Sequence, residues 1–332
     1  MSASTSRFAG ASVLVTGAQG FIGSWLAERL LAEGARVVVP RRDAPSDSRF
    51  RLEGIEERCD VVDADVTDLA AMSRVLAEYE VGFVFHLAAQ TIVGQANRSP
   101  LATFEANVRG TYTLFEACRR EEGAVEGIVV ASSDKAYGTS VDLPYREDHP
   151  LHASYPYDVS KACADLIARS FAETYAMPVA VTRLANVYGP GDLNLSRVVP
   201  GTARALVEGR RPVIRSDGTP RRDYLYAADA VEAYLAVAGS LDRPELRGRA
   251  WNAGPGEPVS VLDLVRRLVR ISGRALEPDV QGDGVPVGEI GVQWLDASAL
   301  RDELGWAPRW SLDAGLAEAW RWYERVPAPL RS

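Results

Sequence analysis

The 332-residue sequence predicts an α/β fold: a doubly wound parallel sheet with helices on both faces, followed by a smaller C-terminal lobe. Short Val-rich runs alternate with amphipathic stretches in the first half, an order typical of parallel strands joined by right-handed helical crossovers. The runs are apolar throughout rather than alternately polar, as expected for strands that are buried on both faces. After about residue 185 this order loosens, and Gly-Pro turns separate the later segments.

The expected elements follow one another along the chain. Apolar runs predict strands over residues 12–16, 36–39, 82–86, 127–131 and 178–183. Helical spacing predicts helices over 21–32, 67–79, 100–121 and 156–175, and later over 198–208, 228–238 and 261–271. We therefore expect one domain over residues 1–185 and a second lobe over 186–332, with some later segments returning to the first domain.

Composition excludes several classes of function. A net charge of -8 without a basic block argues against a nucleic-acid partner. No run approaches the roughly 20 apolar residues of a membrane helix, and the first residues lack the apolar core of a signal peptide. Three widely spaced cysteines, Cys59, Cys118 and Cys163, fit reduced thiols in the cytoplasm better than a disulfide framework. With three histidines and no cysteine cluster, no metal site is expected.

Three glycines follow the first expected strand. They form the pattern Gly17-x-x-Gly20-x-x-Gly23, with Phe21 and Ile22 at the start of the helix. In such a turn the first glycine permits the tight bend, the second lets backbone amides approach a pyrophosphate, and the third permits close helix–strand packing. The free N–H groups and the dipole of the helix favour a phosphate at its N-terminus. We therefore expect residues 1–185 to be a Rossmann-type dinucleotide-binding domain.

The residues after the second strand leave NAD and NADP both open, with NAD expected. The acid that usually ends this strand and binds the adenosine ribose is absent. Arg41 would accept the 2′-phosphate of NADP, whereas Asp43 would reach the ribose of NAD, and a solvated basic corner is the alternative to both. Asp65 and Val66, after the next expected strand-helix step, are candidates for contact with the adenine.

Tyr157 and Lys161 lie four residues apart, on one face of an expected helix. A tyrosine normally titrates near pH 10, but a neighbouring ammonium favours the phenolate, so the pair can supply a base near neutral pH. The preceding strand ends near Ser133, which supplies a hydroxyl to the same site. Together with the glycine loop, these residues predict a dehydrogenase-type active site in which Tyr157, Lys161 and Ser133 are catalytic.

These motifs give the chain a family resemblance over nearly its whole length. The sequence resembles the extended short-chain dehydrogenases/reductases of the nucleotide-sugar epimerase/dehydratase group. Besides the glycine loop and the Tyr157/Lys161 pair, the resemblance rests on His86 to Gln90, Asn107 to Thr111, Ser132 to Gly138, Asn186 to Gly191, Arg222 to Tyr224 and Leu304 to Pro308.

The resemblance implies an enzyme that binds a sugar nucleotide and NAD and oxidises the C4 hydroxyl of the sugar. Tyr157 would take the hydroxyl proton, Ser133 would hydrogen-bond the same oxygen, and Lys161 would hold the nicotinamide ribose. Further cofactor contacts are implied for Leu87, Ala88, Ala89 and Asn107, beside Tyr157 and Lys161. Substrate contacts are implied for Gln90, Ser133, Asn186, Arg197 and Arg222. A homodimer formed through the helices 100–121 and 156–175 is also implied.

Asp134 and Lys135 directly follow Ser133 and favour dehydration over epimerisation. A 4,6-dehydratase eliminates water across C5 and C6, which requires an acid beside the C6 hydroxyl and a base beside C5. The Ser-Asp-Lys order and residues 191–200 most resemble CDP-glucose 4,6-dehydratases. Asp134 would be the acid, and Lys135 would stabilise the enolate, because an ammonium removes a proton only if its pKa is lowered. A structural ion pair between the two is the alternative.

Three functions therefore stand beside one another. A nucleotide-sugar 4,6-dehydratase with a recycled nicotinamide cofactor is the leading hypothesis. A nucleotide-sugar 4-epimerase or a UDP-glucuronate decarboxylase on the same scaffold is the second. A non-catalytic cofactor-binding relative is the third, and the presence of Tyr157, Lys161 and Ser133 argues against it.

Overall fold

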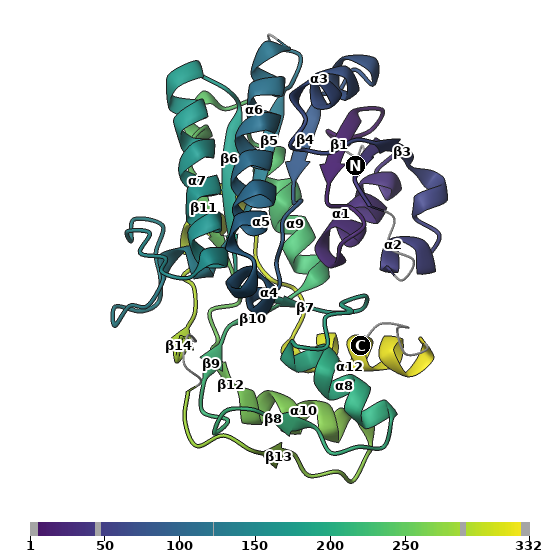
Figure 1. Ribbon diagram of the computed structural model, residues 1–332, viewed down its shortest axis with the longest axis vertical. Helices are drawn as coiled ribbons and strands as arrows, with labels where there is room; N and C mark the ends of the chain where they lie inside the picture. Colours follow the sequence, from purple (N-terminus) through teal and green to yellow (C-terminus); the bar gives the residue numbers. More distant parts are fainter. Residues whose placement is uncertain (1–5, 44–47, 122, 286–289, 327–332) are drawn as a thin grey trace. The chain divides into compact units, whose positions relative to one another are not determined.

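The computed structural model describes residues 6–43, 48–121, 123–285 and 290–326, which fall into two compact units (Figure 1). The first, here called the sheet unit, comprises the chain up to Ala136 together with Ala153–Arg183 and Val231–Trp251. The second unit comprises Tyr137–His152, Leu184–Ala230 and the chain from Asn252 onward. The chain thus passes from one unit to the other several times, and each unit is assembled from segments that are far apart in the sequence.

A seven-stranded sheet forms the centre of the sheet unit, in the order β11-β6-β5-β4-β1-β2-β3. Its strands are β1 Ser12–Thr16, β2 Arg36–Arg41, β3 Asp60–Asp63, β4 Phe83–His86, β5 Gly127–Ser133, β6 Val179–Leu184 and β11 Ala250–Ala253. The pairings β1–β2, β2–β3, β1–β4 and β4–β5 are parallel. The strand order reverses between β1 and β4, and in such sheets ligands bind beyond the carboxyl ends of the strands at this point.

Helices cover both faces of this sheet, which confirms the predicted fold. On one face, α3 Leu69–Glu78, α6 Gly110–Arg120 and α7 Pro156–Tyr175 pack on alternate strand residues, among them Leu14 and Ile128. The intervening residues Val13, Val15 and Phe85 are also buried, so the opposite face is covered as well. There α1 Phe21–Ala32 is joined to α9 Ala227–Ala238 by Arg29, whose Nε donates to Glu232 at 2.7 Å.

The expected helix over residues 100–121 is present, but it contains a π-helical turn that its pattern does not indicate. α5 covers Pro100–Phe104, the π turn covers Glu105–Arg109, and α6 follows directly. The side chain of Asn107 bonds to the backbone of Gln90 in this turn, and Gly110 passes so close to Val66 that an added Cβ would lie 2.9 Å from it. These tertiary contacts explain why a helix-forming sequence carries an extra residue at this point.

The sequence pattern did not predict elements that are short or polar. The edge strand β3 has the sequence Asp-Val-Val-Asp and is only partly buried, so it lacks the apolar character of the central strands. Two short helices, α2 Arg49–Leu52 and α4 Val93–Arg98, have too few turns to show a periodic stripe.

Small sheets and three packed helices make up the second unit. The strands are β7 Asn186–Tyr188 with β10 Tyr224–Tyr226; β9 Arg221–Arg222 between β12 Val259–Ser260 and β14 Val292–Gln293; and β8 Val213–Ile214 with β13 Asp279–Val280. The helices α8 Val198–Val207, α10 Val261–Ser272 and α12 Leu312–Arg325 pack against one another, and α11 covers Ser298–Leu304. Among the described residues, no helix has the length and apolar character needed to cross a membrane.

Two buried carboxylates fix the loops of the second unit. Asp223 accepts hydrogen bonds from the backbone N–H groups of Gly256, at 3.2 Å, and of Glu257, at 3.4 Å. Asp229 accepts bonds of 3.0 Å from the N–H groups of Arg309 and Trp310. A carboxylate in such a position satisfies loop amides that would otherwise be left without partners.

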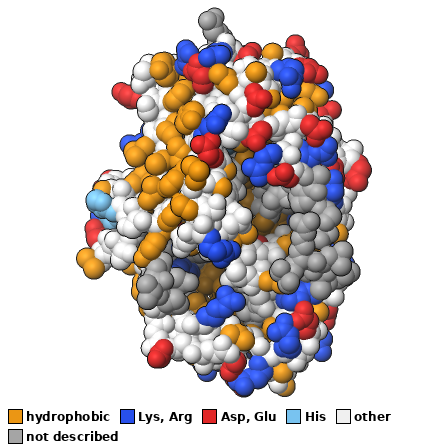
Figure 2. All heavy atoms as spheres, in the orientation of Figure 1, with side chains coloured by type: hydrophobic (Ala, Val, Ile, Leu, Met, Phe, Trp, Pro, Cys, Tyr) orange, Lys and Arg blue, Asp and Glu red, His pale blue; other side chains and the backbone are white. Residues whose placement is uncertain are grey.

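Apolar side chains gather over α6 and α7 on the face drawn in Figure 2. Leu101 on α5, Tyr112 on α6 and Leu166 on α7 are 73%, 45% and 55% exposed. Large exposed apolar residues that cluster on neighbouring helices mark a surface suited to protein contact.

Candidate active site

The glycine loop lies at the end of β1, beside the backbone that follows β4. Gly17 has φ +75°, and a Cβ at this position would lie 2.8 Å from the amide nitrogen of Ala88. A Cβ on Gly23 would lie 2.1 Å from the carbonyl oxygen of Gly17. Both positions therefore require glycine, as sequence analysis predicted for a phosphate-binding turn. No side chain caps Gly20 at the start of α1, so the first N–H groups of the helix are available to an anion.

The arginine at the end of β2 is held by carboxylates of its own unit. The guanidinium of Arg41 donates to Asp63 at 2.9 Å and lies 3.3 Å from Glu56. Arg42 is paired with Asp43 at 2.7 Å. Because these charges are already balanced, the corner offers a weaker site for the 2′-phosphate of NADP than its sequence indicates. Ribose hydroxyls need only hydrogen bonds, which carboxylates such as Asp63 can accept.

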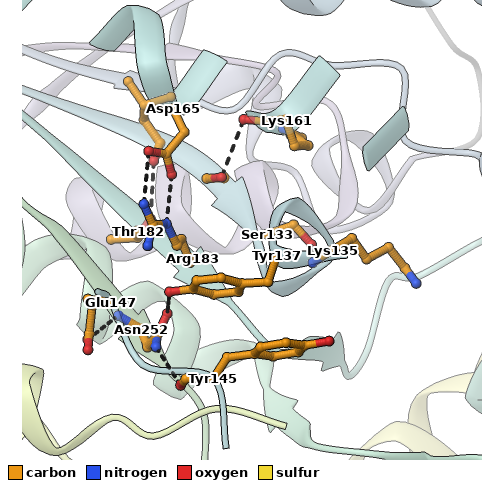
Figure 3. Close-up of polar contacts among 12 residues, drawn as sticks. Ser133, Lys135, Tyr137, Tyr145, Glu147, Lys161, Asp165, Thr182, Arg183 and Asn252 are labelled. Atoms are coloured by element: carbon orange, nitrogen blue, oxygen red, sulfur yellow. Dashed lines mark hydrogen bonds and ion pairs between the residues drawn. The ribbon is translucent and has the colours of Figure 1, made fainter. Parts of the chain in front are cut away.

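The expected Tyr157/Lys161 pair lies in the first turns of α7, and both side chains are buried. Nζ of Lys161 donates a 2.8 Å hydrogen bond to the carbonyl oxygen of Ala131 on β5 (Figure 3). Burial lowers the pKa of Lys161 to about 8, because the ammonium is withdrawn from water. The group remains mainly protonated at neutral pH, so it can favour the phenolate form of Tyr157.

Ser133 ends β5, and Asp134 and Lys135 begin the short helical turn that follows. The hydroxyl of Ser133 donates to Oδ1 of Asp134 at 3.0 Å and accepts from the N–H of Lys135 at 3.3 Å. Asp134 is 2% exposed, whereas Ser133 and Lys135 are half-buried. The three residues that sequence analysis selected here are thus tied together at one strand end.

Asp158 adds a carboxyl that sequence analysis missed. It directly follows Tyr157 in the first turn of α7 and is 5% exposed. The pKa of Asp158 is raised to about 6, mainly by burial; the charge of Lys135 opposes this shift and that of Asp134 adds to it. The carboxyl of Asp158 therefore senses both charged residues of the β5 turn. Its position between Tyr157 and Lys161 was the available signal, but a sequence does not show which neighbours it meets.

Gln90 and Asn107 lie together in the sheet unit, on the segment after β4 and in the π turn. Oδ1 of Asn107 accepts from the N–H of Gln90 at 2.6 Å, and Nδ2 of Asn107 donates to its carbonyl oxygen at 3.1 Å. The side-chain oxygen of Gln90 accepts from the N–H of Ile92 at 2.7 Å. Asp65 caps its own turn by accepting from the N–H and hydroxyl of Thr67. The backbone after β4 is thereby fixed opposite the glycine loop.

The other expected substrate residues, Asn186, Arg197 and Arg222, belong to the second unit. Arg197 is paired with the buried Asp192 at 3.1 Å. The guanidinium of Arg222 is largely buried and donates to the carbonyl oxygens of Arg221, at 2.9 Å, and Gly291, at 3.2 Å. Both guanidinium groups therefore have partners, but Arg222 is largely buried whereas the side chain of Arg197 is 38% exposed.

Two further buried polar clusters were not predicted (Figure 3). In the sheet unit, Arg183 on β6 donates to both carboxylate oxygens of Asp165 on α7, at 2.8 and 3.0 Å. In the second unit, the hydroxyl of Tyr137 donates to Asn252 at 2.8 Å, and the amide of Asn252 donates to the carbonyl oxygen of Tyr145 at 2.9 Å. Arg183 and Asp165 lie 18 positions apart in the sequence, whereas Asn252 lies 115 positions from Tyr137.

Comparison with known proteins places this geometry in a family. The model of the NAD dependent epimerase/dehydratase family matches residues 13–254. The chain is 33% identical over 314 residues to the UDP-glucose 4-epimerase of Mycolicibacterium smegmatis, covering 92% of this chain and 96% of that protein. It is 30% identical over 329 residues to the CDP-glucose 4,6-dehydratase of Salmonella typhimurium, covering 95% and 91%.

A solved structure agrees with these relatives. The dTDP-glucose 4,6-dehydratase of Bacillus anthracis in complex with NAD matches with a TM-score of 0.83 at 26% identity, covering 95% of this chain and 97% of that chain. The relatives include both dehydratases and epimerases. They therefore share a class of enzyme but catalyse different reactions. The chain therefore belongs to the NAD dependent epimerase/dehydratase family, and NAD is its cofactor.

Proposed function

We propose that the protein is a nucleotide-sugar 4,6-dehydratase. The observation that carries the proposal is the presence of two buried carboxyls, Asp134 and Asp158, whose charges act on each other beside Lys135 and the catalytic pair. Elimination of water across C5 and C6 needs an acid and a base in addition to the groups that oxidise C4. Epimerisation at C4 needs neither.

Oxidation at C4 is assigned to the Tyr157/Lys161 pair. The glycine loop and Lys161 would hold NAD, which would supply a hydride acceptor for C4 and a hydride donor for C6, so that turnover would consume no external reductant. Tyr157 accepts the proton of the C4 hydroxyl, and Ser133 orients the same oxygen. Lys161 holds a positive charge in a buried position, where it stabilises the phenolate more strongly than it would in water.

Elimination is assigned to the two carboxyls. Two acids whose charges interact in a buried site favour a state in which one proton is present between them. We assign this proton to Asp134, which donates it to the departing C6 hydroxyl. Asp158, which is deprotonated above its pKa of about 6, accepts the proton from C5 and later returns it to that carbon. Lys135 then stabilises the negative charge that develops on the oxygen at C4, which suits an ammonium better than proton abstraction does.

Substrate binding is assigned to Gln90 in the sheet unit and to Asn186, Arg197 and Arg222 in the second unit. A fixed guanidinium suits a diphosphate because it presents a planar pair of donors that match two phosphate oxygens. The guanidinium of Arg222, which is held by carbonyl oxygens within the second unit, supports this assignment.

The proposal is tested by the mass of the product. The purified protein is incubated separately with CDP-glucose, dTDP-glucose and UDP-glucose without added reductant. Mass spectrometry should show loss of one water from one of them, and the 4-keto product should absorb in the ultraviolet after addition of base. A product that keeps its C6 hydroxyl would reject dehydration.

A 4-epimerase is the second candidate, favoured by the 33% identity to a UDP-glucose 4-epimerase. An epimerase would convert its substrate without any change of mass. Conversion of UDP-glucuronate with loss of carbon dioxide would instead indicate a decarboxylase. Nuclear magnetic resonance of the sugar then distinguishes epimerisation from the absence of a reaction.

A homodimer accompanies the proposal. Leu101, Tyr112 and Leu166 supply exposed apolar area on adjacent helices, the kind of surface that a second copy would cover (Figure 2). The Leu166→Glu variant should be monomeric by light scattering at concentrations at which the wild type is dimeric. The three cysteines are free, which supports the expectation of a reducing compartment such as the cytoplasm.

A further inference from the structure

A continuous set of buried hydrogen bonds links the end of β1 to the first turn of α7. It passes through β4, α6 and the π turn, and every element belongs to the sheet unit. The side chains that form it are almost fully buried: Thr16, His86, Thr111, Asn107 and Ser160 are at most 3% exposed. Buried polar groups without partners are costly, so a set of this kind is expected to be either complete or absent.

The donors and acceptors of this set can be assigned one by one from His86. The hydroxyl of Thr16 accepts from the N–H groups of Leu87 and Ala88, both at 3.1 Å, so its own proton must point to Nδ1 of His86, at 2.9 Å. The hydroxyl of Thr111 donates to the carbonyl oxygen of Asn107 at 2.6 Å. Thr111 must therefore accept from Nε2 of His86, at 3.1 Å.

Only one form of the His86 ring satisfies both ends. The proton lies on Nε2, and Nδ1 carries none, because Thr16 donates and Thr111 accepts. Burial and, to a smaller extent, the nearby charge of Lys161 lower the pKa of His86 to about 3, so the ring stays neutral at any pH at which the protein functions.

The second half of the set runs from the π turn to the catalytic helix. Both protons of the Asn107 amide are used, one on the carbonyl oxygen of Gln90 and one on Oγ of Ser160, at 2.8 Å. The hydroxyl of Ser160 in turn donates to the carbonyl oxygen of Tyr157 at 2.6 Å. The backbone of Tyr157 is therefore tied to the π turn, and the π turn to His86.

We propose that His86 is a positioning residue, which fixes Tyr157 relative to the phosphate-binding strand through Thr111, the π turn and Ser160. His86 is the branch point: its Nδ1 holds the strand that leads into the glycine loop, and its Nε2 holds the π turn. The inference deepens the proposed function, since it takes Tyr157 as the group that removes the C4 hydroxyl proton. Displacement of a catalytic group by an ångström or less is enough to lower a rate substantially.

Thr111→Val and Thr111→Ser form the first matched pair of variants. Valine keeps the volume and removes the hydroxyl, whereas serine keeps the hydroxyl and loses a methyl group. We expect Thr111→Val to lower kcat at least tenfold, with KM for the sugar nucleotide and bound NAD per protein unchanged, and Thr111→Ser to remain within about threefold of the wild type. A purely structural role would lower the melting temperature of Thr111→Val without this loss of kcat per folded molecule.

His86→Gln and His86→Asn form the second pair and decide the matter if Thr111→Val does not fold. The glutamine amide reaches the position of Nε2 and keeps a donor for Thr111, while the asparagine oxygen reaches the position of Nδ1 and keeps an acceptor for Thr16. We expect His86→Asn to lose kcat and keep NAD, and His86→Gln to lose NAD and keep more of kcat. Equal losses of both quantities in both variants would overturn the inference, as would unchanged kcat in Thr111→Val.

The wild type separates failure of this inference from failure of the proposed function. If the wild type turns over no sugar nucleotide, the proposed function fails whatever the variants do. If the wild type dehydrates its substrate and the variants match it, His86 has no positioning role. Long-range proton–nitrogen spectra give a readout independent of activity: His86 should show a protonated Nε2 and no titration between pH 5 and pH 9, and a titrating ring would reject the assignment.

Discussion

The buried carboxyls Asp134 and Asp158 of the sheet unit differ from the buried carboxyls Asp223 and Asp229 of the second unit in what they contact. In the sheet unit, charged side chains lie near other charged or catalytic side chains, as Asp158 does with Asp134 and Lys135. In the second unit, the buried carboxylates of Asp223 and Asp229 accept backbone N–H groups of loops. The first arrangement changes the proton affinity of reactive groups, and the second fixes the shape of a binding surface. Substitutions in the sheet unit should therefore alter kcat, and those in the second unit should alter KM.

The largest effect is expected at the catalytic tyrosine. Tyr157→Phe removes one oxygen from a buried position in the sheet unit and leaves the ring to pack. Loss of a general base typically lowers a rate by 10²- to 10⁴-fold, so we expect kcat to fall by about 10³-fold with little change in KM. Steady-state kinetics with the sugar nucleotide gives both constants. Tyr175→Phe, at the other end of α7 and half-exposed, is the control. A fall of less than tenfold in Tyr157→Phe would exclude this residue as the base.

The next effect separates the two halves of the proposed reaction. Asp158→Asn should leave C4 oxidation intact and slow elimination by about 10²-fold, because the amide cannot accept the C5 proton. NADH absorbance should then rise on mixing with substrate and decay slowly, and exchange of the C5 proton with solvent deuterium should be lost. Glu173→Gln removes an exposed carboxylate from the same helix and should have no effect. If Asp158→Asn eliminates water at the normal rate, a residue other than Asp158 removes the C5 proton.

The pH dependence of elimination follows from the same residue. Burial raises the pKa of Asp158 to about 6, and a base functions only when deprotonated. The rate of elimination in the wild type should therefore rise with pH up to and through about 6 and level off above it. In Asp158→Asn this rise should disappear. A rate that falls as the pH increases through 6 would show that Asp158 acts as an acid instead.

A smaller effect, of the opposite kinetic type, is expected in the second unit. In the wild type, the carboxylate of Asp223 accepts hydrogen bonds from the N–H groups of Gly256 and Glu257. Asp223→Asn replaces one of the two accepting oxygens with an NH₂ group, which cannot accept them. Hydrogen bonds to a charged group contribute about 1.5–3 kcal/mol each, so the loop beside Arg222 should loosen. We expect KM for the sugar nucleotide to rise about tenfold while kcat stays within threefold, measured by initial rates. Asp217→Asn, at a half-buried position in the same unit, is the control. A large loss of kcat with normal KM would contradict the division between the units.

The features predicted from the sequence are those that one element carries by itself. The spacing of Gly17, Gly20 and Gly23 and the interval between Tyr157 and Lys161 lie within a single turn or helix, so a local pattern is sufficient to find them. Asp158 was adjacent to this pattern and was still missed, because its environment is set by Asp134 and by Lys135 on another element. Proton affinity depends on neighbours in space, which a single sequence does not give.

The π turn and the hydrogen bonds of His86 show the same limit at greater distance. Residues 100–121 have a helical pattern. That pattern does not show that the side-chain amide of Asn107 forms two hydrogen bonds with the backbone of Gln90. The histidine meets Thr16, 70 positions earlier in the chain, and Thr111, 25 positions later. Networks that join several strands and helices become visible only when the fold brings their members together.

The smallest effect is expected at an exposed edge of the sheet unit. A substitution there should change neither kcat nor KM for the sugar nucleotide, but only the choice of cofactor. Arg41 is paired with Asp63, which is 81% exposed, and with Glu56. An exposed ion pair contributes about 0.2–1 kcal/mol, so Asp63→Ala should strengthen the binding of NADP relative to NAD by no more than about fivefold. Glu56 still balances the guanidinium in this variant. Fluorescence titration of the cofactor-free protein with each dinucleotide measures the ratio.

Asp60→Ala is the matched control for this substitution. It removes the exposed partner of Arg36 from the same two strands, but at their opposite end, where the pair bonds at 2.7 Å. The ratio of NADP to NAD binding should not change in this variant, because the amino end of a parallel sheet does not face the cofactor. A tenfold or larger shift in Asp63→Ala would mean that Asp63 itself excludes the 2′-phosphate by its charge. Cofactor choice would then depend on repulsion at β3 rather than on the neutralised guanidinium of β2.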